Sequence, residues 1–99
     1  MRSEEDQKRD ALTDVRRGSE AEALLSNPLY VEAVTAMRAA MFSAFEDAKL
    51  EDKELRHELW QRMQLMKQFQ GKFESIVKHG AKGKQTLSML DKAKQKIGF

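Results

Sequence analysis

Two histidines and a lysine-rich segment between glycines are the residues of this 99-residue chain that most resemble chemical sites. His57 and His79 stand 22 positions apart, and neither has a second imidazole one helical turn away, as a helical metal site requires. We interpret both as surface histidines. The chain has no cysteine, so it has no disulfide, no thiolate metal ligand and no thiol nucleophile.

The second candidate is the segment Gly80-Ala81-Lys82-Gly83-Lys84-Gln85-Thr86, which superficially resembles a phosphate-binding loop. Such a loop has four residues between its glycines, a Ser or Thr directly after the lysine, and a strand before it. Here two residues separate the glycines, Gln85 follows Lys84, and a helical pattern precedes the segment. We therefore predict a flexible basic hinge and no nucleotide site.

Carboxylates are plentiful, but they stand among lysines and arginines on polar faces, without the apolar enclosure that acid–base catalysis uses. A chain this short, with no buried polar cluster in prospect, offers no place to desolvate a substrate. The sequence therefore predicts a protein that is not an enzyme and has no metal, no cofactor and no small-molecule substrate.

Charge is distributed unevenly along the chain. Residues 18–48 carry five acidic side chains and one basic one, Arg38, whereas residues 80–99 carry five lysines against Asp91. Two interpretations fit this pattern: solvated helix faces, or a basic tail that contacts nucleic acid or the acidic part of a neighbouring copy. The lysines that would make the contact are Lys82, Lys84, Lys92, Lys94 and Lys96.

Glycine and proline divide the sequence into segments. Gly18 and Gly80 predict three parts: a charged N-terminal arm over 1–17, a helical-hairpin domain over 18–80, and a basic C-terminal tail over 81–99. In the tail, Leu87, Leu90, Ala93 and Ile97 predict a short amphipathic helix. Ser19 followed by Glu22 has the spacing of a capping box, which predicts a short helix from Ser19 to Leu25.

Apolar residues spaced alternately by four and three predict two long helices, from Pro28 to about Ala48 and from about Lys53 to His79. Asn27 and Asp52 are the expected caps, and Gly80 is the expected end of the second helix. Because so few residues join these helices, they must fold back antiparallel. We expect the contact between them to be made by Tyr30, Val34, Met37, Met41, Leu59, Met66, Phe69 and Phe73.

The predicted fold is therefore all-α, an antiparallel helical hairpin of two long helices with short flanking helices at both ends. Its apolar residues extend beyond one line of contact, so something else must cover them. The short flanking helices could complete a monomeric bundle, or another copy or partner could pack there. The residues predicted for a partner interface are Phe42, Phe45, Trp60, Leu65, Leu87 and Leu90.

The charged first twenty residues contain no apolar core of a secretory signal, and no uncharged stretch approaches the roughly 20 residues of a membrane span. We therefore expect no contact with a membrane. The second long helix begins among Glu51, Asp52 and Glu54, which repel phosphate, so we expect no helix-turn-helix recognition of DNA.

Three features of the sequence carry a resemblance: Leu24-Leu25-Ser26-Asn27-Pro28-Leu29-Tyr30-Val31-Glu32-Ala33, then Asp52-Lys53-Glu54-Leu55-Arg56-His57-Glu58-Leu59-Trp60, then the closing Gly80. Together they resemble a family of short tailed-phage (podovirus-like) proteins. The likeness covers about residues 24–87. Such proteins are encoded among head and packaging genes without an assigned activity, so the resemblance transfers no functional residue.

The resemblance implies a structural or assembly protein of a tailed bacteriophage that packs against itself or a larger virion protein, in the host cytoplasm during assembly or in the virion. The alternative is a DNA-packaging accessory, similar to a small terminase subunit, that contacts nucleic acid through the basic tail. A small regulator that binds a host protein fits the same sequence.

Overall fold

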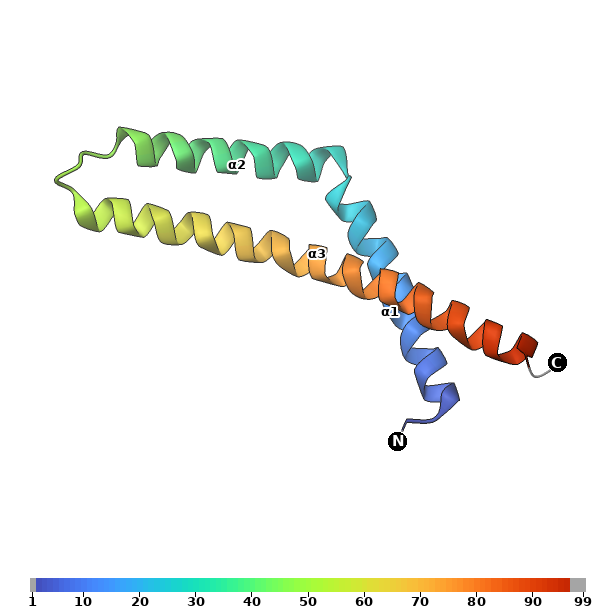
Figure 1. Cartoon of the computed structure of the whole chain (residues 1–99). Helices are drawn as coiled ribbons and strands as arrows, with labels where there is room; N and C mark the ends of the chain where they lie inside the picture. Colours follow the sequence, from blue (N-terminus) through green and yellow to red (C-terminus); the bar gives the residue numbers. More distant parts are fainter. Residues whose placement is uncertain (1, 97–99) are drawn as a thin grey trace. The chain divides into compact units, whose positions relative to one another are not determined.

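The structure, a computed structural model, describes residues 2–96 and contains three helices (Figure 1). They are α1 (Glu4–Leu25), α2 (Pro28–Asp47) and α3 (Lys53–Lys96). No strand occurs among the described residues, so the prediction of an all-helical chain is confirmed. Ile97 of the predicted tail helix lies outside the described residues.

The helix starts at Pro28 and Lys53 follow from local capping chemistry. The Asn27 Oδ1 accepts a hydrogen bond from the backbone N–H of Leu29 at 2.9 Å, and Pro28 occupies the first helical turn, where its missing N–H costs nothing. The Asp52 Oδ1 likewise accepts from the N–H of Leu55 at 3.1 Å. Both predicted caps are confirmed.

Contacts between the helices divide the chain into two compact units. One combines the residues up to Ala23 with those from Phe73 onward, and we call it the α1–α3 unit. The other is Leu24–Lys72, which contains α2 and the first part of α3, and we call it the α2–α3 unit. The predicted division into 1–17, 18–80 and 81–99 does not follow these units.

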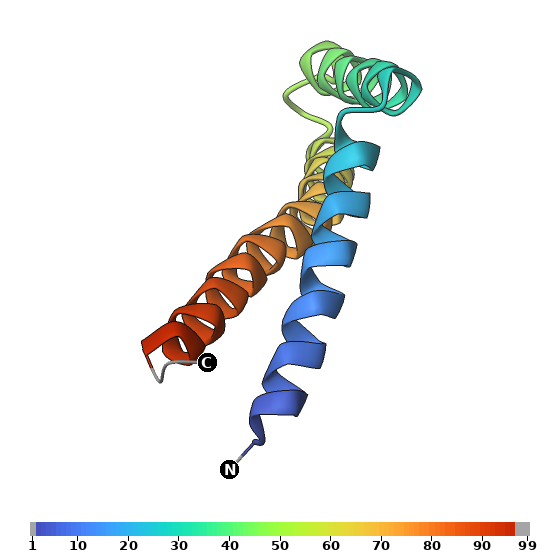
Figure 2. The same cartoon turned by 90° about the vertical axis from the view of Figure 1, so that its right-hand side faces the viewer.

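In the α1–α3 unit, α1 lies beside the second part of α3 (Figure 1 and Figure 2). Two glycines bring the two backbones into contact. A Cβ added at Gly18 would lie 2.8 Å from the Gly80 Cα, and one added at Gly80 would lie 2.9 Å from the Gly18 Cα. Both glycines are buried inside continuous helices, so the predicted segment boundary at Gly18 and the predicted helix end at Gly80 are wrong. A glycine inside a helix costs about 1 kcal/mol in propensity, and close backbone packing offsets that cost here.

The same close packing includes part of the predicted N-terminal arm. A Cβ at Gly83 would lie 2.7 Å from the carbonyl oxygen of Ala11, and Ala11 itself is only 4% exposed. Ala11, Gly18 and Ala21 lie seven and three residues apart, so they share one face of α1. Residues 1–17 are therefore not a separate arm, because from Glu4 onward they belong to a helix that packs on α3.

The predicted short helices at the two ends are also parts of longer helices. Ser19, the expected start of one, lies inside α1, and Leu87 and Leu90 of the other lie inside α3, where both are partly buried. The segment from Gly80 to Thr86 is helical, so the predicted basic hinge is wrong. The predicted division of the chain at Gly18 and Gly80 is wrong because neither glycine breaks its helix. Each lacks a side chain where the two helices come into contact.

In the α2–α3 unit, α2 and the first part of α3 run antiparallel and side by side (Figure 1). Leu59 is the buried apolar residue of this unit, and Tyr30, Val34, Met41 and Met66 are partly buried, as expected for the contact between the helices. Phe73, also expected in that contact, is partly buried but belongs to the α1–α3 unit. Two other residues predicted for the contact, Met37 and Phe69, are 56% and 55% exposed, so they lie at its margin.

Arg56 holds the connection between α2 and α3. Its Nη1 donates hydrogen bonds to the carbonyl oxygens of Phe45 at 3.4 Å and Ala48 at 3.3 Å, which the end of α2 leaves without helical partners. Its guanidinium carbon also lies 4.3 Å from the centroid of the Phe45 ring. One side chain of α3 therefore closes the last turn of α2.

We expect replacement of Gly18 or Gly80 by alanine to lower the free energy of unfolding by about 1–3 kcal/mol, because the new methyl group would overlap a backbone that cannot move aside cheaply. The matched control is Gly71→Ala, where an added Cβ meets nothing within 4 Å. That change should raise stability by up to about 1 kcal/mol through helix propensity. Thermal unfolding followed by circular dichroism measures all three, and equal gains at all three positions would refute the backbone contact.

We expect Arg56→Met to destabilise the chain by about 1–3 kcal/mol, because it removes the donor to two carbonyls while keeping much of the packing volume. Arg56→Lys keeps the positive charge above Phe45 but loses the planar donor group, so its loss should be smaller. Urea unfolding monitored by helix content compares the two variants. A stability of Arg56→Met equal to the parent chain would show that the tie between the helices contributes nothing.

Candidate association surface

The histidines lie on the surface, as predicted. His57 and His79 are both exposed, and the His57 ring stacks on Trp60 with ring centroids 6.0 Å apart and an interplanar angle of 17°. Across the described part of the chain, no group of three or more His, Cys, Asp or Glu side chains is placed to hold a metal ion.

The basic residues of the predicted tail are exposed but do not share a face. Lys82, Lys84, Lys92 and Lys94 all lie on α3, and the side chain of Lys96 lies outside the described residues. Successive residues of a helix are rotated by about 100° around its axis, so Lys84, Lys92 and Lys94 point roughly 200°, 280° and 120° away from Lys82. They therefore surround the helix and form no single stripe against which a phosphate backbone could lie.

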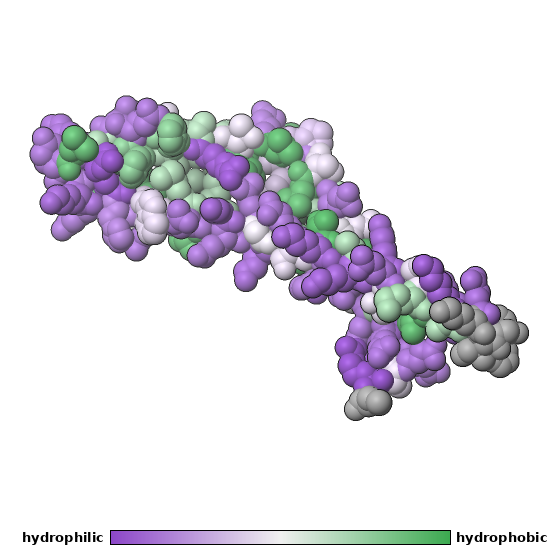
Figure 3. Space-filling model, viewed as in Figure 1, coloured by the Kyte–Doolittle hydropathy of each residue, from purple (hydrophilic) through white to green (hydrophobic). Residues whose placement is uncertain are grey.

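The α2–α3 unit carries most of the exposed apolar surface. α2 has no buried residue along its whole length, although it is the most apolar of the three helices. Figure 3 shows hydrophobic side chains gathered over α2 and the first part of α3. The large exposed hydrophobic residues of this unit are Leu24, Leu29, Val31, Met37, Phe42, Leu50, Leu55, Trp60, Leu65 and Phe69.

The six residues predicted for a partner interface fall into two groups. Phe42, Trp60 and Leu65 are half exposed or more. Phe45 is partly buried beneath Arg56, and Leu87 and Leu90 are partly buried in the α1–α3 unit. Phe42, Trp60 and Leu65 are therefore accessible on the surface, whereas the other three residues are partly buried within the chain itself.

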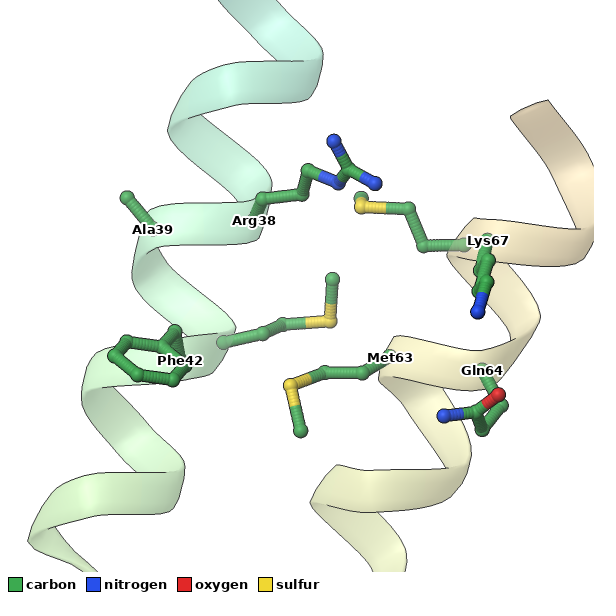
Figure 4. A pocket seen from close by; sticks show the side chains of 8 residues that line it. Arg38, Ala39, Phe42, Met63, Gln64 and Lys67 are labelled. Carbon is green, nitrogen blue, oxygen red and sulfur yellow. The ribbon is translucent and has the colours of Figure 1, made fainter.

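A groove of about 480 Å³ lies between α2 and α3, and we call it the methionine groove (Figure 4). Arg38 and Met63 extend into the space between the two helices. The groove is lined by Arg38, Ala39, Met41, Phe42, Met63, Gln64, Met66 and Lys67. Three of the chain's six methionines therefore meet in one place, with two cations and no carboxylate among the lining residues.

A second hollow lies on α3 beside the methionine groove. It is lined by Trp60, Leu65 and three glutamines, Gln61, Gln64 and Gln68. Gln64 belongs to both hollows, so Trp60 and the methionine groove border one another. The combined surface is apolar and amide-rich, and its charges are the two cations.

The methionine groove is not evident from the sequence. Its lining comes from two stretches about 25 residues apart, and neither stretch alone shows that Arg38 and Lys67 flank the same hollow. One signal was available: Arg38 is the single basic residue of the acidic segment 18–48.

The connection between the helices presents a contrasting surface, the tip, which we define as residues 46–54. Leu50 is 78% exposed, the highest value among the large hydrophobic side chains of the described residues. Around it the tip carries five carboxylates and two lysines. An apolar projection with a negative surround therefore stands at the end of the same two helices that form the cationic groove.

No described helix has a stretch both long enough and apolar enough to cross a bilayer. No family model, no curated protein and no solved structure matches this chain. The resemblance to short tailed-phage proteins stays a prediction.

Proposed function

We propose that this chain is a non-enzymatic structural or assembly protein that works by packing its α2–α3 unit against itself or a larger protein. The observation that carries the proposal is the absence of any buried residue along α2. A helix that is apolar around most of its circumference is normally enclosed by other helices. Here α3 covers one side only, and Phe42 and Trp60 remain at least half exposed.

Energetics support the same proposal. Among the described residues, the buried apolar side chains are Ala11, Ala21 and Leu59, and a Leu contributes about 1.5–3 kcal/mol when fully buried. Two antiparallel helices with so little enclosed surface are marginal alone, since packing provides most helical stability in proteins. Association would enclose the aromatic and methionine side chains and stabilise the helices that carry them.

The setting we propose is a tailed bacteriophage, on the resemblance of residues 24–87 to short podovirus-like proteins. The finer fold that goes with it is an antiparallel helical hairpin that acts as the associating element, in the host cytoplasm during assembly or in the virion. The DNA-packaging alternative has weaker support, because the described tail lysines surround α3 and form no stripe.

We expect light scattering to give the purified protein a mass of at least twice the 11.4 kDa of one copy, measured over a wide range of concentrations. Replacement of the tail lysines by glutamine tests the alternative without removing the part of α3 that packs on α1: DNA affinity that falls steeply with salt and disappears in a variant with Lys82, Lys84, Lys92, Lys94 and Lys96 replaced would favour the packaging function. A strict monomer at every concentration, with no DNA binding, would contradict both.

We expect Trp60→Ala to weaken association by about 2 kcal/mol, ~30-fold, with a smaller effect on folding, because this half-exposed side chain borders the groove. Sedimentation equilibrium measures association, and helix content measured on the same samples reports folding. Equal losses of association and helix content would place Trp60 in the core of the unit and remove it from the interface.

A further inference from the structure

The tip and the methionine groove are complementary in shape and charge. Leu50 projects from the tip, whereas the groove is a hollow lined by flexible methionine side chains that adapt to an inserted group. The tip carries five carboxylates against two lysines, Lys49 and Lys53, so its formal charge is −3 (five negative, two positive), and two cations flank the groove. An occupant of the groove should therefore be apolar with negative charge beside it, and the tip has that chemistry.

The two features lie at a separation that a symmetric pair of chains can match. The middle of the groove, near residue 40 of α2, lies seven residues before the end of that helix at Asp47, which is about 10 Å along the helix, and Leu50 follows three residues later in the connection. If two α2–α3 units lie antiparallel and overlap by the distance from tip to groove, the tip of each reaches the groove of the other. The two-fold axis then passes midway between tip and groove, and both contacts are equivalent.

We propose that the chain forms a two-fold symmetric dimer in which Leu50 of each copy inserts into the methionine groove of the other. Glu46 and Glu51 then approach Arg38 and Lys67 of the opposite copy. This dimer deepens the proposed function and rests on it, because it names the second copy as the partner of the α2–α3 unit.

Other side chains of the unit lie where this overlap would cover them. Trp60 stands on α3 between the tip and the groove, seven residues before Lys67 and so on the same face of the helix. Phe42 lines the groove, four residues before Glu46. Four helices would then surround the methionines and both aromatic rings, which is the arrangement of a four-helix bundle.

The arrangement is also closed. Each copy gives one tip and accepts one tip, so no unfilled groove remains to recruit a third chain. Opposite charges beside an apolar contact fix its register and oppose wrong pairings, since a groove facing another groove would bring four cations together.

The first test removes the inserted side chain. Leu50→Ser should raise the dissociation constant of the dimer by about 100-fold or more, because each dimer loses two buried leucines. The matched control is Leu29→Ser, the same change at a residue that is 75% exposed at the far end of α2. Sedimentation equilibrium should show the control unchanged within a few-fold, and equal effects of the two variants would overturn the proposal.

The second test exchanges charges. The groove variant, Arg38→Glu with Lys67→Glu, and the tip variant, Glu46→Lys with Glu51→Lys, should each lose at least about tenfold in self-association, because like charges meet in both contacts. An equimolar mixture should form a heterodimer of about wild-type affinity, because each tip then meets an oppositely charged groove. A matched charge control is Lys78→Glu with Lys92→Glu, two exposed positions in the α1–α3 unit.

Failure of the tip-in-groove dimer and failure of the proposed function give different results in these experiments. A parent chain that is monomeric throughout would overturn both. A parent chain that associates, with Leu50→Ser unaffected or with no gain on mixing the two charge variants, would overturn the tip-in-groove dimer alone. Masses that grow continuously with concentration would indicate open chains of tips and grooves and would contradict two-fold closure. Recovery of association on mixing excludes misfolding as the cause of the separate losses.

Discussion

Two helices packed as a pair enclose only the side chains that lie between them, and the rest of the α2–α3 unit depends on this constraint. α2 is apolar around much of its circumference, yet α3 covers one side of it and leaves no residue of α2 buried. The exposed rings of Phe42 and Trp60 and the methionine groove are consequences of this incomplete cover. Hydrophobic surface of this extent in a small unit favours association, because each copy gains by burying what it cannot bury alone.

The α1–α3 unit meets the same constraint in a different way. Its buried positions on α1 are Ala11, Gly18 and Ala21, and opposite them stand Gly80 and Gly83. Small residues bring the backbones together, so dispersion contacts form along the main chain without large side chains. This packing buries the facing sides of both helices over that length, and most of the large exposed hydrophobic residues of the described chain lie instead in the α2–α3 unit.

Features fixed by neighbouring residues were predictable, and features fixed by distant ones were not. Asn27 before Pro28 and Asp52 before Lys53 specify helix starts through bonds within one turn, so the sequence identified both. The sequence predicts boundaries at Gly18 and Gly80 because it does not by itself distinguish a glycine that ends a helix from one that allows another backbone to approach. The two differ only in what lies opposite, and here each glycine lies opposite the other.

The candidate site was predictable in part for the same reason. Helical periodicity correctly identified Phe42, Trp60 and Leu65 as apolar residues beyond the contact between the helices, since three of the six predicted interface residues are at least half exposed. It could not show that Leu87 and Leu90 become partly buried in the α1–α3 unit, nor that Phe45 lies under Arg56. Arg38 and Lys67 become a pair only when α2 and α3 lie side by side.

Arg38 and Lys67 matter because a groove lined by methionine accepts many apolar groups. Met41, Met63 and Met66 can reshape around many apolar groups, so contact with them provides affinity but little selection between partners. Fixed charges at the edge add the selection, since an apolar group with cations beside it is repelled from the groove and one with carboxylates beside it is attracted. In the proposed dimer the uneven charge of the chain would therefore have a structural use: Arg38, the lone basic residue of an acidic segment, lines the groove and would favour an acidic partner over a basic one.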